Sequence, residues 1–354
     1  MSLKGYEEAS LRPPAADDAA ASDSDWDWGE VLLDKAAYMA DRKNHTTADC
    51  QFTRDLDGKQ INLRVTLCLA QPPRVSYFCC LAHCPADRGK EEDTPRLFVG
   101  EPWMIATDGE LALFTLCHGD DRCSRTRMGN HDYFVYDAAP SPPGTPRLTR
   151  LPQLDDGMLP AMEPSASAPA ISASRVTAAA TTRMMLMPTG SPRSPTTTSA
   201  RTIPDTTCAL KDSGVVRFID LQVHAEPGRR SQTPSGWTVV AWTLEGLDGG
   251  LELDNLRFKE EYQLSSREIS NYRLPQSLFV CKPILSSHED GVLYLLTNAS
   301  SQDCRTSKVI AVDIKKNELL RVADFDMQRP NIYMRTTISS HLKPHYHCLP
   351  GDDN

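Results

Sequence analysis

Residues 290–325 hold three short apolar runs separated by turn signals, and this pattern limits the chain to a few folds. The Asp290-Gly291 pair opens the segment, a loop of small polar residues follows the first run, and the charged turn 315–318 follows the second. Short apolar runs broken in this way predict an antiparallel meander. The expected strands are Val292–Thr297, Val309–Asp313 and Leu319–Ala323.

The same unit recurs nearer the N-terminus, where an Asp-Gly pair again precedes apolar runs. The matching segments are DGELALFTL at 108–116, DYFVYDA at 132–138 and PRLTRLP at 146–152, with a weaker copy at 212–223 and 237–244. Asp137 and Asp313 each close a strand. Repeated meanders of roughly 40–50 residues predict a propeller-like, all-β fold. An ordinary antiparallel sandwich uses the same strands and turns and stays open as the alternative.

Further strands follow from residue alternation. Ile61–Ala70 places Ile61, Leu63, Val65 and Leu67 on one face and Asn62, Arg64 and Thr66 on the other, as in a half-buried strand. Val75–Leu81 is apolar on both faces, which predicts a central strand. Asp108-Gly109 predicts a hairpin turn. The other expected strands are 103–106, 111–116, 131–137, 147–151 and 278–285.

Composition divides the chain into five parts. Residues 1–25 are rich in Ala, Asp, Ser and Pro, which predicts a disordered tail, with order beginning at Trp26. Residues 26–154 form an N-terminal meander half, 208–335 a C-terminal half and 336–354 a tail. Residues 155–207 lack periodicity and predict a disordered insert. Our hypothesis is that 157–204 are a GC-rich coding region read in the wrong frame or across a wrong splice site, rather than a linker.

Charge and cysteine content narrow the partners and the compartment. A net charge of −9 argues against a general nucleic-acid binder, which needs a basic face. No apolar run approaches the roughly 18 residues of a membrane-spanning helix, and no secretory signal is visible. We therefore expect an intracellular protein, cytoplasmic or nuclear, and read the 11 cysteines as buried thiols rather than a disulfide framework.

Three clusters could carry chemistry, and each has a simpler interpretation. The CCxxHC segment holds Cys79, Cys80, His83 and Cys84, but neighbouring strand residues point to opposite faces, which disfavours zinc. The HxxxHxHC segment holds His341, His345, His347 and Cys348 in a solvated tail. Asp324 and Asp326 share a strand face and fit a solvated edge. We assign no catalytic, cofactor-binding or metal-binding residue and no cofactor.

Two blocks of the chain resemble a large plant family, abundant in grasses, called domain of unknown function 1618. The N-terminal block comprises WGEVLLDKAAYMADRKNHTTAD at 28–49, LCLAQPPRVSYFCC at 67–80 and HDYFVYDA at 131–138. The C-terminal block comprises VVRFIDLQVHAEPG at 215–228, GWTVVAWTL at 236–244, LPQSLFVCKPILS at 274–286 and the segment from 290 to 334. Together they cover roughly two thirds of the chain.

The resemblance implies a damaged centre. Members of this family carry a GFVDLWRGIL-like segment and several strands between the blocks, and the patternless residues occupy that place here. At least one blade-sized piece is then missing or scrambled, so the ring is incomplete and exposed strand edges lower its stability. The family has no established activity and no assigned site residues, so the resemblance supplies none.

The functional expectation is a non-catalytic scaffold whose loops bind an unknown protein partner. By analogy it resembles the substrate-reading domains of plant F-box proteins, although no F-box segment precedes it. A hydrolase-type enzyme is the first alternative, with Asp108, His131, Asp137, Asp313 or Asp324 converging in a propeller channel. A truncated, non-functional family member is the second. No nucleic-acid, membrane or small-molecule partner is expected.

Overall fold

The structure is a computed structural model whose described part consists of β-strands, turns and two short 3-10 helices. The described residues are 7–14, 29–55, 58–85, 97, 100–117, 131–140, 144–152, 205–210, 216–225, 234–245, 257–269, 278–298, 307–325 and 333–341. The chain divides into two compact units. Unit 1 comprises residues 1–159 and 328–354, and unit 2 comprises residues 160–327.

Unit 1 contains two sheets. One has the order β17-β1-β4-β3-β2, and the other has the order β5-β6-β7-β8. The strands of the first are β1 Val31–Asp34, β2 Ala48–Thr53, β3 Gln60–Cys68, β4 Val75–His83 and β17 Tyr333–Thr336. The strands of the second are β5 Trp103–Asp108, β6 Leu111–Cys117, β7 His131–Asp137 and β8 Arg147–Arg150.

The core of unit 1 combines the inward-facing residues of both sheets. Ile61, Leu63, Val65 and Leu67 of β3 are at most 3% exposed, as their alternation predicts. They share one apolar cluster with Phe78 of β4, Phe114 of β6 and Phe134 of β7. Burying these side chains removes apolar surface from water. Each buried Å² stabilises the fold by about 25 cal/mol, and this gain drives the sheets together.

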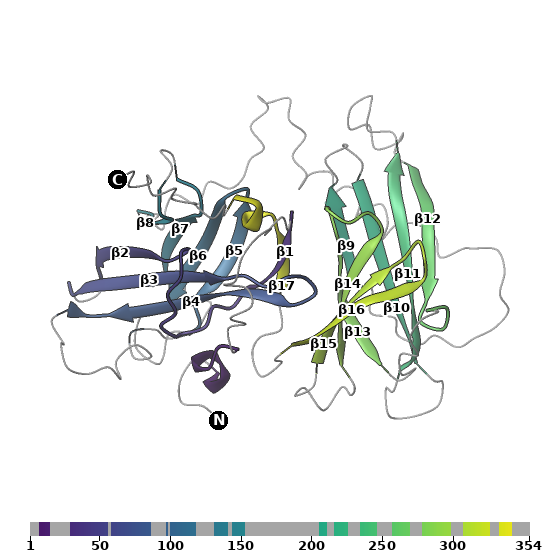
Figure 1. The fold of residues 1–354 in the computed structure, drawn as a ribbon, viewed down its shortest axis with the longest axis horizontal. Coiled ribbons are helices and arrows are strands. Elements are labelled where there is room, and N and C mark those ends of the chain that lie inside the picture. Colours follow the sequence, from purple (N-terminus) through teal and green to yellow (C-terminus); the bar gives the residue numbers. More distant parts are fainter. Residues whose placement is uncertain are drawn as a thin grey trace, which may run out of the picture. The chain divides into compact units, whose positions relative to one another are not determined.

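Unit 2 also contains two four-stranded sheets, with the orders β12-β11-β10-β9 and β13-β14-β15-β16 (Figure 1). The first comprises β9 Asp205–Leu210, β10 Val216–Ala225, β11 Pro234–Glu245 and β12 Arg257–Ser265. The second comprises β13 Phe279–Leu285, β14 Val292–Asn298, β15 Ser307–Asp313 and β16 Glu318–Phe325. Leu221 and Trp237 from the first sheet join Leu293 and Ile310 from the second in one core cluster.

The expected all-β class and the antiparallel meanders are confirmed. Strands β14, β15 and β16 form the meander read from residues 290–325, and β6, β7 and β8 form its expected copy. Each set is extended by one strand into a four-stranded sheet. Gly109 and Gly291, the glycines of the two Asp-Gly pairs, have φ of 53° and 84°, a region that glycine reaches without steric cost. Among the described residues, the structure shows no closed barrel or propeller.

The end of the chain differs from the expected division. The C-terminal half was expected to run through 335, but β17 pairs antiparallel with β1 in unit 1 (Figure 1). In this pairing, Leu33 lies opposite Met334. Ile338, expected in a solvated tail, is fully buried in the unit 1 core within the 3-10 helix Ile338–His341. An apolar side chain at that position gains more from the core than from water, which overrides the polar composition around it.

The beginning of the chain also differs from the expected disordered tail. Residues Glu8–Leu11 form a 3-10 helix, η1, and Ser10 is fully buried. The Ser10 hydroxyl and the Glu7 N–H both donate to the Glu101 carboxylate, at 2.9 and 2.8 Å. These polar contacts and the packing of Leu11 against the unit 1 core hold the segment, and its composition alone does not reveal them. Residues 1–6, 15–28 and 153–204, including Trp26, Trp28 and most of the expected insert, lie outside the described residues.

Candidate functional sites

The two strand-closing aspartates have turn-stabilising roles. The Asp313 carboxylate accepts the N–H groups of Lys315 and Lys316, at 2.9 and 3.0 Å, and so fixes the turn between β15 and β16. Asp137 accepts the N–H of Ala139 at 3.2 Å and the Arg147 guanidinium at 3.3 Å. Aspartate commonly stabilises turns by bonding backbone N–H groups a few residues ahead. The repeated apolar-x-apolar-Asp pattern is therefore a turn signal.

The other candidates for acid–base chemistry do not converge within either unit. In unit 1, His131 begins β7 and Asp137 ends it, a separation of roughly 20 Å at 3.3 Å per residue. His131 instead lies 3.2 Å from the Thr115 hydroxyl, and Asp108 is exposed at the β5–β6 turn. In unit 2, Asp313 lies opposite Glu318 at one end of β15, whereas Asp324 lies opposite Lys308 at the other.

Asp324 is a solvated ion-pair partner. Its side chain is 89% exposed and its carboxylate lies 2.5 Å from the Lys308 ammonium. Asp326, the second member of the expected carboxylate pair, lies outside the described residues. An exposed pair of this kind contributes little to stability because water screens it.

The CCxxHC segment does not surround a common point. Cys80 lies in the unit 1 core, whereas Cys79 lies on the outer face of the same sheet beside Tyr38 and Tyr77, as the alternation predicts. His83 is exposed and lies 3.3 Å from the Asn62 side chain. Among the described residues, no group of three or more metal-ligating side chains converges. His341 ends the 3-10 helix, and His345, His347 and Cys348 are outside the described part.

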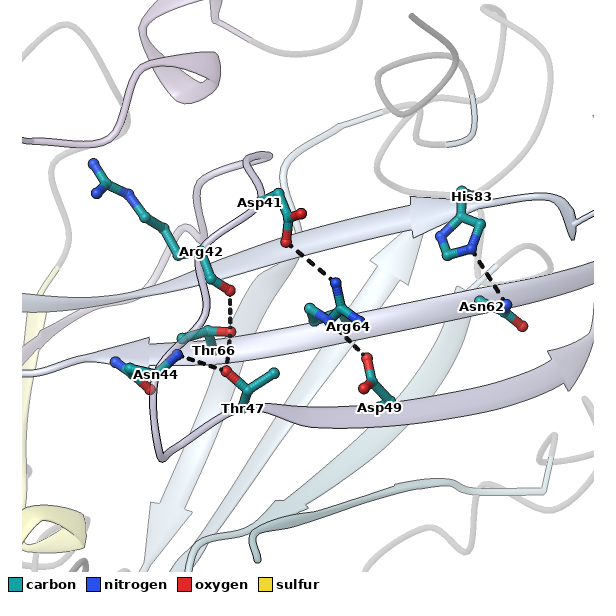
Figure 2. Close-up of polar contacts among 9 residues, drawn as sticks. All are labelled: Asp41, Arg42, Asn44, Thr47, Asp49, Asn62, Arg64, Thr66 and His83. Carbon is teal, nitrogen blue, oxygen red and sulfur yellow. Dashed lines mark hydrogen bonds and ion pairs between the residues drawn. The ribbon is translucent and has the colours of Figure 1, made fainter. Parts of the chain in front are cut away.

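A row of polar contacts covers the outer face of β2, β3 and β4 (Figure 2). Arg64 on β3 donates to Asp49 at 2.9 Å and to Asp41 at 3.4 Å, and Thr66 donates to the Arg42 carbonyl at 2.6 Å. Desolvation opposes the Arg64 charge, but the bonds to Asp49 and Asp41 raise its pKa overall. The row attaches segment 41–47 to the outward face of β3. This is the polar face that the alternation of residues 61–70 predicted.

A buried ion pair in unit 1 escaped the sequence analysis. Asp132 on β7 is 1% exposed, and its carboxylate accepts the Arg150 guanidinium of β8 at 2.6 and 3.0 Å. Arg150 also donates to the Thr53 carbonyl of β2 and pairs with Asp55. In β7, Asp132 lies on the same face as the buried Phe134 and Tyr136. A charged residue at such an inward position was the signal in the sequence for this ion pair. The contacts of this ion pair join β2, β7 and β8, so its role is structural.

Two cavities in the described part of unit 1 are small. One is lined by Asp34, Lys35, Cys80 and their apolar neighbours, and another by Phe52, Arg54, Asp132 and theirs. Each has a volume of about 10 Å³, close to one water molecule. Sites for small organic ligands usually span roughly 300–1,000 Å³. Neither cavity can therefore admit such a ligand without rearrangement.

Four of the five large apolar side chains that are exposed in the described residues lie at sheet edges, and the fifth, Leu111, lies on the inner strand β6. Ile105 lies on β5 and Leu151 directly follows β8, which are the two edge strands of one sheet in unit 1. In unit 2, Leu320 and Val322 lie on the edge strand β16 and are 38% and 45% exposed. An edge strand carrying exposed apolar groups is a template on which another chain can pair.

Comparisons with protein-family models, with curated proteins and with solved structures gave no match to this chain. The resemblance to domain of unknown function 1618 therefore stays a prediction. None of the helices in the described part of the chain has the length and apolar character needed to cross a membrane.

Proposed function

We propose that the protein is a non-catalytic interaction scaffold, and that the edge strand β16 receives an extended segment of a partner protein. The observation that carries this proposal is the pair Leu320 and Val322, both large, apolar and exposed on a strand with no neighbour on one side in the described part of unit 2. Main-chain bonds to such an edge give affinity, and the side chains beside it give specificity.

The position of Val322 supports an added strand. Val322 lies opposite Ile310, which belongs to the unit 2 core, so it continues the apolar inner surface to the sheet's edge. A partner strand placed beside β16 would bury part of Val322, which is 45% exposed. The partner chemistry that fits is an extended segment with apolar side chains on the face that meets Val322.

Two other edge strands of unit 2 are protected against such pairing. The edge strand β12 carries the run Lys259-Glu260-Glu261, whose charges disfavour association. The edge strand β13 is interrupted by a bulge between Cys281 and Ile284, and Pro283 within it has no N–H to donate. The bulge in β16 lies around Leu320 and leaves residues 321–325 regularly paired with β15, so its outer side stays suited to pairing.

The test is recovery of partners by affinity purification with mass spectrometry, using the full chain and two matched variants. Val322→Lys places a charge where the partner strand would dock and should remove the partners that the unmodified chain enriches. Leu111→Lys, at a side chain 40% exposed on β6 of unit 1, should retain them. Thermal melting of each variant checks that folding is intact. Identical partner sets for both variants, or no enriched partner at all, would overturn the proposal.

A ring of blades is the finer architecture we propose for the four sheets. Support comes from the four-stranded meander that three of the four sheets share, because propeller blades are four-stranded sheets, and from the pairing of β17 with β1, which joins segments from both halves of the chain in the remaining sheet. The scattered aspartates and histidines lend no support to the alternative hydrolase. The seven cysteines whose side chains the structure describes are free thiols, which supports the proposed cytoplasmic or nuclear location.

A further inference from the structure

Two cysteines on neighbouring strands share the outer face of the five-stranded sheet in unit 1. Cys68 ends β3 and lies opposite Tyr77 of β4, while Cys79 lies opposite Thr66, so the two cysteines are diagonal neighbours. Both belong to one small cluster with Tyr38 and Tyr77. Cys79 is 1% exposed, whereas Cys68 is only partly buried, and both are free thiols. One accessible thiol thus lies beside one protected thiol.

The surroundings of Cys68 include donors and a positive charge. Thr66 holds the Arg42 backbone by a 2.6 Å bond to its carbonyl, beside the end of β3. The Arg42 guanidinium and the Tyr77 hydroxyl both donate to the Pro14 carbonyl, at 3.2 and 3.1 Å. Arg42 and Tyr77 therefore meet at the Pro14 carbonyl, and Tyr77 lies opposite Cys68 in the sheet.

These neighbours favour the Cys68 thiolate. A hydrogen bond from the Cys79 thiol lowers the pKa of Cys68, and the Tyr77 hydroxyl and the Arg42 charge act in the same direction against desolvation by burial. The pKa of Cys79 is raised by the bond it donates and by burial, so this thiol keeps its proton. A lower thiol pKa increases the thiolate fraction at neutral pH, and the thiolate is the reactive form.

We propose that Cys68 and Cys79 are a redox-reactive pair, in which a hydroperoxide oxidises Cys68 and Cys79 then closes a cross-strand disulfide. The Cys68 thiolate attacks the peroxide O–O bond, and with one proton this gives a sulfenic acid and, from hydrogen peroxide, one water. The Cys79 sulfur displaces the sulfenic hydroxyl, which leaves with the thiol proton as a second water. Two thiols are oxidised to a disulfide, and the peroxide is reduced to water.

The diagonal register sets the expected lability of this disulfide. Diagonal neighbours have Cα atoms roughly 7–8 Å apart, slightly beyond the usual disulfide range of about 4.4–6.8 Å. Cys68 is the last residue of β3, so only the end of the ladder must shift to close the bond. A bond formed with such a shift is easily reduced. We therefore expect reversible oxidation rather than a permanent cross-link.

The test is oxidation of the reduced full chain with hydrogen peroxide, followed by alkylation and non-reducing tryptic mapping. Cleavage after Arg64, Arg74 and Arg88 separates Cys68, in 65–74, from Cys79, in 75–88. The two peptides should appear linked, with the loss of two hydrogen atoms, and should separate after dithiothreitol. Cys79→Ser should abolish the link and leave a Cys68 sulfenic acid that dimedone traps. Cys84→Ser, on the same tryptic peptide, should leave the link unchanged.

A second measurement needs no variant. Burial raises the pKa of Cys50, whereas the pKa of Cys68 is lowered. As the pH is increased, iodoacetamide should therefore begin to alkylate Cys68 at a lower pH than Cys50. The proposal is overturned if peroxide leaves the two peptides unlinked, if Cys79→Ser retains the link through Cys80 or Cys84, or if Cys50 is alkylated before Cys68.

Discussion

Removing Arg150 should strongly destabilise unit 1 because it deprives a buried carboxylate of its arginine. Asp132 is 1% exposed, and two Arg150 nitrogens contact its Oδ1 at 2.6 and 3.0 Å. The hydrogen bonds of Arg150 to Asp55 and Asp132 outweigh desolvation and raise the Arg150 pKa, so the guanidinium keeps its charge. The perturbation we consider is Arg150→Ala.

The expected magnitude follows from these contacts. Breaking a buried ion pair by removing one partner costs roughly 3–5 kcal/mol, because the remaining charge stays in the protein interior. Loss of the bond to the Thr53 carbonyl adds about 1 kcal/mol. The Arg150 side chain is 20% exposed, so water can partly replace it in the variant. We therefore expect a loss of about 3 kcal/mol in the free energy of unfolding.

Urea unfolding followed by circular dichroism measures this loss, and hydrogen–deuterium exchange of β7 peptides assigns it to unit 1. Arg147→Ala is the matched control, because Arg147 is 64% exposed and its pair with Asp137 spans 3.3 Å. We expect this control to cost less than about 1 kcal/mol. The double variant Asp132→Ala/Arg150→Ala should recover part of the loss. The reasoning fails if Arg150→Ala behaves like Arg147→Ala, or if the double variant recovers nothing.

Two further predictions concern a turn and the overall arrangement. Gly291→Ala should cost about 1–2 kcal/mol, because φ is 84° and the new Cβ would lie 2.9 Å from the Lys315 side chain. Gly58→Ala, at φ 68° with open space around it, should cost less in the same thermal melts, and equal costs would contradict the steric reason. For the proposed ring, small-angle X-ray scattering of the full chain should give a distance distribution with a single peak. A two-peaked distribution would exclude the ring.

The sequence alone determined the all-β class and the local meanders. The alternation in residues 61–67, the Asp-Gly turns at 108–109 and 290–291, and the doubly apolar run 75–81 all act over a few residues, and each has the structure that was predicted. Strands β1, β2, β9, β12 and β17 were not predicted. These segments are polar or short. They become strands because a neighbouring strand supplies their backbone hydrogen-bonding partners, and the sequence of a single segment does not encode that neighbour.

Only the tertiary structure decided which distant residues meet. The pairing of β17 with β1, the burial of Ile338 and the bond of Ser10 to Glu101 each join segments far apart in the chain. The Asp132–Arg150 ion pair and the Cys68–Cys79 neighbourhood depend on strand register, and a shift of one residue would move every side chain to the other face. Local periodicity fixes which face of a strand is apolar, but the register and partner of that strand depend on packing across the whole unit.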